Sequence, residues 1–252
     1  MKLNFVTCSG ANEHTNIPEL VSIMQEFPIA EIGIQVSEKK CGYESPRLAW
    51  LNSLVEYVNT HNISINAAVH VNLKWVKDFC HGVVAPELLE ILALHDCNGD
   101  YFIKRVQLNM LTSREHPDEA RLVNAIKACK GRRFILPYNK ENADLVHRLY
   151  LQGLWFDCLY DESFGKGIEP SKREAPRFMD ILQGYAGGIS PDNVYHVLNE
   201  IHAAWSKFPT DVGIYIDAHG KLENQDTHLD LNKMRRYLSD AKQWKMDHPF
   251  EP

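Results

Sequence analysis

The sequence lacks the features that mark a membrane protein, a secreted protein or a nucleic-acid-binding protein. No apolar run is long enough to cross a membrane, and the first residues, "MKLNFVTCSG", have neither the basic region nor the long apolar stretch of a signal peptide. The formal net charge is −6, and the densest basic runs, "KGRR" (130–133) and "KMRR" (233–236), are short. We therefore expect a cytoplasmic protein with neither nucleic acid nor a membrane as partner.

Cysteine spacing and histidine spacing exclude two further classes. The six cysteines form no CxxC pair and no compact framework, which favours free thiols in a reducing compartment. The twelve histidines include no His-x-His pair in the first apolar run, and "CHG" (80–82) and "HDC" (95–97) fall in expected loop or helix. We expect no metal, although a metal-dependent enzyme stays open as an alternative.

Strand-like and helix-like segments alternate along the whole chain. No Pro/Gly/Ser-rich linker divides it, so we expect a single domain over residues 1–252. Eight apolar, β-rich runs recur about every thirty residues: 3–8, 31–36, 64–71, 102–108, 132–137, 154–160, 180–186 and 211–217. Helical spacing follows at 45–61, 86–96, 118–129, 139–152, 192–205 and 230–244.

This alternation predicts the α/β class and a single (β/α)₈ barrel. The competing doubly wound sheet in its dinucleotide-binding form requires a glycine-rich fingerprint after the first strand, where this chain reads "CSGANE". In barrels the active site forms at the carboxyl ends of the strands, and phosphate sites follow strands 7 and 8. The segment "AGGIS" (186–190) follows the seventh strand, so its adjacent glycines favour phosphate contact over an ordinary tight turn.

Side chains that could take part in catalysis or ligand binding occur at the ends of several expected strands. They are Cys8, Gln107, Asp161, Asp217 and His219, together with Arg47 in the loop after the second strand. Each has a plainer interpretation: Cys8 could be a small buried apolar residue, and Asp161 could be a turn residue. Together they provide a thiol base, an acid and a cation near a glycine-lined anion site. An acid and a base on opposite sides of a sugar are what aldose–ketose isomerisation needs.

Seven motifs in this order resemble phosphoribosylanthranilate isomerase, a tryptophan-biosynthesis barrel of the ribulose-phosphate-binding group. They are "VTCSGAN", "ESPRLAWL", "AAVHVN", "VQLN", "LYDESFGKG", "YAGGISPDNV" and "YIDAHGKLEN". The chain departs from the family where "VQLNML" replaces a motif ending in histidine and glycine, and where "AHG" brings in His219. It is also longer than the family, chiefly after the third strand and in the loop "GIEPSKREAPRF".

The resemblance implies an Amadori rearrangement of a small phosphorylated aminosugar, with no cofactor. It implies Cys8 as the general base and Asp161 as the general acid. Arg47 would hold a planar carboxylate. Gln107, Asp217 and His219 would contact the substrate. Backbone amides of Gly187, Gly188 and Gly220 would bind the phosphate. A non-catalytic or regulatory barrel that only binds a phosphorylated metabolite is the second interpretation, and the sequence leaves the oligomeric state open.

Overall fold

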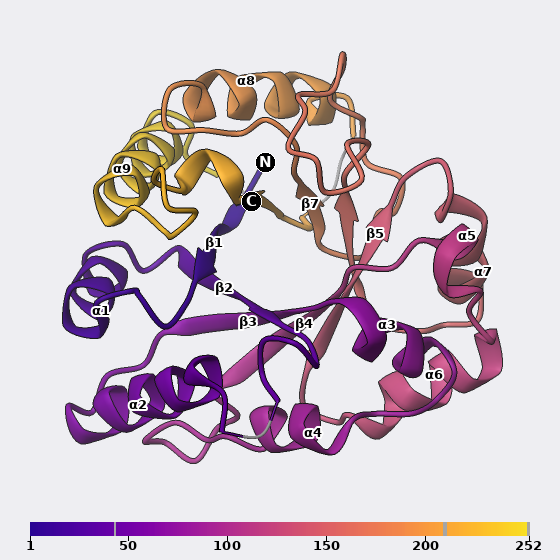
Figure 1. Ribbon diagram of the computed structural model, residues 1–252. Coiled ribbons are helices and arrows are strands. Elements are labelled where there is room, and N and C mark those ends of the chain that lie inside the picture. The colour runs from indigo at the N-terminus through magenta and orange to yellow at the C-terminus, as the bar shows by residue number, and fades with distance from the viewer. Residues whose placement is uncertain (43, 209–210, 251–252) are drawn as a thin grey trace.

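Eight parallel strands close into a barrel in sequence order, which confirms the predicted fold class. The computed structural model describes residues 1–42, 44–208 and 211–250. Every one of the eight predicted runs overlaps a strand, and Figure 1 shows the helices as an outer ring around the strands. The strands are β1 Leu3–Ala11, β2 Ala30–Val36, β3 Asn66–Val71, β4 Ile103–Leu108, β5 Arg133–Tyr138, β6 Asp157–Tyr160, β7 Gln183–Tyr185 and β8 Ile214–Ala218.

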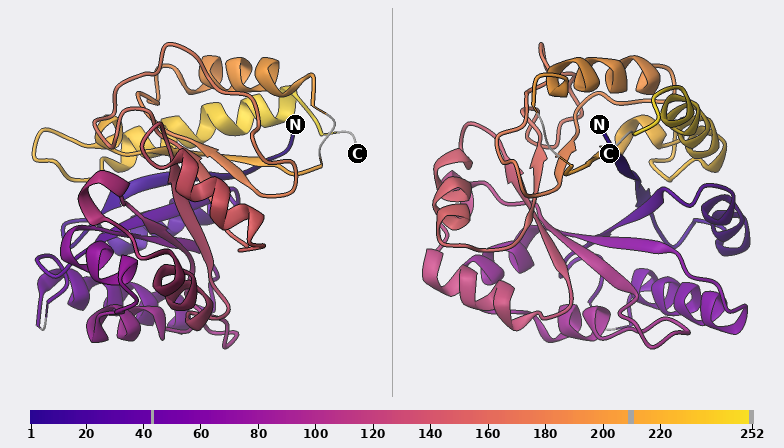
Figure 2. Two further views of the ribbon diagram at one scale, coloured as in Figure 1. Left: turned by 90° about the vertical axis from the view of Figure 1, so that its right-hand side faces the viewer. Right: turned by 180° about the vertical axis from the view of Figure 1, so that it is seen from behind.

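The helices cover the outside of the barrel, and α8 and α9 lie next to each other on one side in each view (Figures 1 and 2). The helical segments are α1 Ile17–Glu26, α2 Pro46–Thr60, α3 Leu73–Cys80, α4 Pro86–Leu92, α5 Thr112–Glu115, α6 Glu119–Ala128, α7 Ala143–Leu151, α8 Val194–Trp205, the short 3₁₀ helix η1 Gly220–Leu222 and α9 Leu231–Asp247. The segments α1, α3, α5 and η1 were not expected from the sequence. The start of helix α1 has the usual sequence signals of a helix N-terminus: the Asn16 side chain caps the helix, and a proline occupies its first turn. No helix of the described residues is long and apolar enough to cross a membrane.

Strand β1 shows which side chains fill the barrel and which face the helices. The Thr7 hydroxyl donates to Glu31 of β2 at 2.8 Å, and the Ser9 hydroxyl donates to Asp217 of β8 at 2.7 Å. Both side chains therefore point into the barrel. Because side chains alternate along a strand, Val6 and Cys8 face outward and pack in the core between barrel and helices.

A buried network of charged side chains lies inside the barrel, near the amino-terminal ends of the strands. Arg105 donates to Glu31 at 2.8 Å and to Asp157 at 3.0 Å, and its guanidinium lies 4.0 Å from the centre of the Tyr215 ring. Arg133 pairs with the other oxygen of Asp157. Burial raises the pKa of both carboxyl groups, an effect that the arginines oppose. This network supports the floor of the cavity above it.

The connection between β6 and β7 lies beside α8 (Figure 1). Its buried Arg173 donates to the carbonyl oxygens of Ala186 and Gly187, at 3.0 and 3.2 Å. The same guanidinium lies 3.8 Å from Glu200 on α8. Arg173 thus ties this long loop to the turn that carries the paired glycines.

Candidate functional site

A cavity of about 410 Å³ opens at the carboxyl ends of the strands, between the barrel mouth and the loops above it. Of the predicted site residues, it brings together Gln107, Asp161, Gly187, Gly188, Asp217, His219 and Gly220. It also contains residues that were not singled out from the sequence, chief among them Gln35, His70, Asn72, Asn109, Lys166 and Lys221. This position matches the end of the barrel at which active sites form.

Asp217 is an acid in this cavity whose pKa is raised above its usual value. Its side chain is buried, with the whole residue 8% exposed, and it accepts the Ser9 hydroxyl hydrogen bond. Burial raises its pKa to about 6, the Ser9 hydrogen bond and His219 act to lower the pKa, and Asp161 raises it further. A carboxylate with a pKa close to the working pH is suited to accept a proton and release it again.

His70 lies at the floor of the same cavity. It comes from β3 and is 3% exposed. Burial, helped by the positive potential of His219 and Arg105, lowers its pKa to about 3, so the imidazole is neutral over the physiological range. Its Nε2 atom is buried and makes no hydrogen bond within the described part of the chain. The sequence signal was a histidine in the alternating run "AAVHV", but alternation alone does not tell the barrel interior from the helix side.

Amide side chains at the ends of β3 and β4 form a chain of hydrogen bonds along the cavity wall. Gln107 Nε2 donates to Asn109 Oδ1 at 2.7 Å, and Asn109 Nδ2 donates to Asn72 Oδ1 at 2.9 Å. Asn72 Nδ2 then donates to the carbonyl oxygen of His70 at 2.7 Å. Gln107 Oε1 remains buried and, among the residues described, without a partner.

Asp161 lines the cavity, but its oxygens already hold a turn together. Oδ1 accepts hydrogen bonds from the amide and the hydroxyl of Ser163, at 3.0 and 2.5 Å. Oδ2 accepts one from the Gly165 amide at 2.7 Å. These hydrogen bonds support the interpretation of Asp161 as a turn residue. Its role as a general acid stays a prediction.

Cys8 is not brought into the cavity, which corrects the expectation that its thiol is the general base. The residue is 0% exposed and faces the helices, where it lies near Tyr237 of α9. Burial raises the pKa of the thiol well above its usual value, and the nearby carboxyl groups of Asp217 and Glu31 raise it further. A thiol in these surroundings stays protonated and unreactive.

Adjacent substitutions on β1 test this correction. We expect Cys8→Ala to leave the pKa of Asp217, followed by carbon-13 NMR titration, at its wild-type value. Ser9→Ala should raise that pKa, because the Ser9 hydroxyl hydrogen bond lowers it. A shift in the cysteine variant with none in the serine variant would contradict the assigned facing of β1.

Arg47 is also displaced from its expected position. Its guanidinium pairs with Glu13 and donates to the Gln35 carbonyl at 3.1 Å. It lines a smaller, adjoining pocket of about 210 Å³ that shares only Gln35 and His219 with the main cavity. The Glu13 carboxylate occupies the position that a substrate carboxylate was expected to take, so the structure does not support Arg47 as an open anion site.

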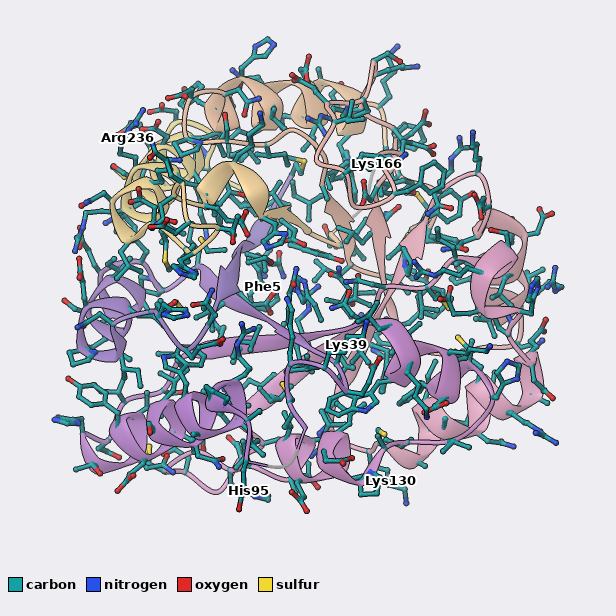
Figure 3. All side chains as sticks on the ribbon, viewed as in Figure 1. Phe5, Lys39, His95, Lys130, Lys166 and Arg236 are labelled. Atoms are coloured by element: carbon teal, nitrogen blue, oxygen red, sulfur yellow. The ribbon has the colours of Figure 1, made fainter. Side chains whose placement is uncertain are left out.

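A groove of about 730 Å³ adjoins the main cavity above β7 and β8, where the sequence predicted a phosphate site. Gly188, Gly220, Lys166 and Lys221 line both the groove and the main cavity. Figure 3 shows Lys166 on the loop after β6 and Arg236 on α9, two of the basic residues that line this groove. The groove is also lined by Glu169 and Asp192, and Arg236 pairs with Asp192 at 2.6 Å. Lys166, Lys221 and the backbone beside the start of α8 are the groups that an anion in the groove would meet.

The paired glycines also have a structural reason. Gly188 has a φ of +68°, and a Cβ there would lie 2.6 Å from the Cβ of Glu169. We expect Gly188→Ala to lower the free energy of unfolding by about 1–3 kcal/mol, measured by urea denaturation. Gly220→Ala is the matched control, because its only near neighbour would be Glu223 Oε2 at 4.0 Å. Equal losses in the two variants would show that packing of the Glu169 loop does not explain the glycine at 188.

Among the described residues, no three His, Cys, Asp or Glu side chains are grouped so as to hold a metal ion. All six cysteines carry free thiols. The metal-dependent alternative therefore gains no ligand set from this part of the chain.

Comparison with known proteins gives structural matches only. No protein-family model matches the chain, and no curated protein matches it in sequence. The crystal structure of TrpF from Jonesia denitrificans aligns over 98% of this chain and 99% of its own, with 14% identity and a TM-score of 0.54. A monomeric form of phosphoribosylanthranilate isomerase from Thermotoga maritima aligns over 95% and 99%, with 13% identity and a TM-score of 0.52. At this level of identity, the comparisons show that the chain shares their barrel fold.

Proposed function

We propose that this protein is an isomerase for a small phosphorylated sugar, with Asp217 as the general base. The observation that carries the proposal is a buried carboxyl group with a pKa of about 6 at the barrel mouth. At neutral pH most of this group is ionised, and its protonated form is still accessible. Moving a proton between adjacent carbons of a sugar requires a group of this kind.

In the Amadori form of the reaction, two carboxyl groups divide the proton transfers. Asp161 gives a proton to the ring oxygen as the bond between that oxygen and C1 breaks, and an iminium forms at C1. Asp217 then removes the proton from C2, which gives an enolamine. Asp217 returns a proton to C1, and Asp161 takes the proton of the C2 hydroxyl, so the product is an isomer of the substrate. Both residues line one cavity, and Asp161 lies close enough to Asp217 to raise its pKa.

The finer proposal is the phosphoribosylanthranilate isomerase reaction. Motif order and the shared barrel fold support it, and Lys166 and Lys221 beside Gly188 and Gly220 would hold the phosphate. Asn109 and His219, which come from the departing motifs "VQLN" and "AHG", line the cavity, and we expect them to change which substrates it admits.

A coupled assay tests the proposal by supplying freshly generated phosphoribosylanthranilate and following the decay of its fluorescence. Turnover that is lost in Asp217→Asn and kept in Cys8→Ala is expected. Absence of turnover, with inorganic phosphate still raising the melting temperature, would reject this substrate and keep a phosphosugar site. Absence of both would reject the proposed function.

A barrel that binds a phosphorylated metabolite without turnover is favoured by one observation: within the described chain, the hydrogen-bond donors to the Asp161 carboxylate come from its own turn, from Ser163 and Gly165. A carboxylate held in this way is less free to transfer a proton. If Asp161→Asn and Asp217→Asn change only the affinity for phosphorylated ligands, the binding function replaces the enzymatic one.

A further inference from the structure

The floor of the cavity holds two buried side chains, each with one polar atom that has no hydrogen-bond partner among the described residues. His70 and Gln107 are register partners on the adjacent strands β3 and β4, so their side chains lie side by side and line the same cavity. They are 3% and 5% exposed. His70 Nε2 and Gln107 Oε1 each make no hydrogen bond within the described chain. Buried polar atoms are nearly always paired, so this pair points to a ligand.

The amide chain fixes which atom of Gln107 faces the cavity. The chain ends on the His70 carbonyl oxygen, which can only accept, so Asn72 Nδ2 is the donor there. Asn72 Oδ1 is then the acceptor for Asn109, and Asn109 Oδ1 is the acceptor for Gln107 Nε2. Gln107 Oε1 is left as an acceptor that needs a donor from the ligand.

The neighbouring imidazole complements this acceptor. Burial keeps His70 neutral, so Nε2 either donates or accepts one hydrogen bond, according to its tautomer. A hydroxyl group can donate to Gln107 Oε1 while it accepts from the Nε2–H of His70. A phosphate or a carboxylate has no proton to give to Gln107 Oε1 and would leave it unpaired.

We propose that His70 and Gln107 form a hydroxyl-binding pair, which makes this cavity specific for a polyhydroxylated ligand. This inference takes one point from the proposed function, namely that the ligand carries a phosphate group that is bound above the strands. In this proposal a sugar hydroxyl, and not a second anion, binds at the floor of the cavity. His70 is then a residue that determines ligand specificity.

The test compares two ligands with the same phosphate and carbon number: ribose 5-phosphate and n-pentyl phosphate, which has no hydroxyl. Titration calorimetry should show that His70→Phe weakens ribose 5-phosphate binding about tenfold or more and leaves n-pentyl phosphate binding unchanged. Gln107→Met should give the same pattern, and His70→Gln, which keeps a polar atom, should recover part of the affinity. His61→Phe, at the exposed end of α2, is the matched control.

Equal weakening of both ligands, or no change in either, would overturn the pair as a hydroxyl site. Inorganic phosphate separates this failure from failure of the proposed function. If phosphate binds but ribose 5-phosphate binds no more tightly than n-pentyl phosphate, the hydroxyl pair is rejected and the phosphate site stands. If none of the three binds, both proposals are rejected.

Discussion

Asp217→Asn is expected to reduce kcat/KM at least about a thousandfold, because the amide cannot accept the proton that the reaction moves. The substitution keeps the shape of the side chain, and an amide oxygen can still accept the Ser9 hydrogen bond. The loss should therefore fall on kcat, with the affinity for ribose 5-phosphate changed much less. Asp240→Asn, on the exposed side of α9, is the control for the chemical change alone. Wild-type turnover in Asp217→Asn would exclude Asp217 as the base.

The same substitution should stabilise the protein above pH 6. The pKa of Asp217 is raised from 3.8 to about 6 on folding, so the folded state holds the proton more tightly than the unfolded state. Its contribution to stability is therefore fully present below about pH 4 and is lost as pH rises through 6. Asparagine removes that loss, and urea denaturation at pH 8 should show a gain of about 1–3 kcal/mol. A variant that is less stable at pH 8 would contradict the raised pKa.

Under the proposed function, kcat/KM of the wild-type protein should rise with pH through about 6 and then level off, because the base must be ionised. Ser9→Ala should move this rise to higher pH. A profile that is flat between pH 5 and 7 would place the proton transfer on another group.

Arg105→Met is expected to give the largest loss of stability, about 3–5 kcal/mol by urea denaturation at pH 7. The arginine is the shared partner of Glu31 and Asp157, and the carboxylate side chains are 1% and 0% exposed. Its removal leaves Glu31, among the residues described, with only the hydrogen bond from the Thr7 hydroxyl. Two buried carboxyl groups without their cation must either stay charged at a high cost or take up protons.

Two further variants separate charge from packing in this network. Arg133→Met should cost less, because Arg133 is a third exposed and Arg105 still pairs with Asp157. Adding Glu31→Gln to Arg105→Met should recover part of the loss, because it removes one unpaired charge. If the double variant is less stable than Arg105→Met, packing of the guanidinium on Tyr215 matters more than its charge.

The sequence was sufficient for the architecture. Each of the eight apolar runs overlaps a strand, because a parallel barrel strand is buried on both faces and forms a continuous β-rich segment in the sequence. The order of the strands then followed from the right-handed, neighbour-to-neighbour connections of β/α units. Asp217, at the end of the eighth predicted strand, and His219, just after it, were predicted to lie at the mouth, and both line the cavity.

The sequence could not decide which face of a strand lies inside the barrel. In "VTCSGA" both alternating sets are buried, so nothing local distinguishes Cys8 from Ser9. Closure of β1 against β2 and β8 turns Thr7 and Ser9 inward and Cys8 outward. The same ambiguity hid His70 of β3, which is the register partner of Gln107 and whose Nε2 has no hydrogen bond among the described residues.

Long-range contacts decided the remaining parts of the site. Arg47 is occupied because the β1 loop brings Glu13 against it, and Gly188 is bare at least partly because the loop carrying Glu169 lies on it. Neither neighbour is close in the sequence. By itself the sequence determined the eight-strand barrel and the residues at its strand ends, because hydrophobic alternation and turn chemistry are local. Only the tertiary structure decided which of those side chains share a cavity and which pKa values shift, because facing and burial depend on what closes around each residue.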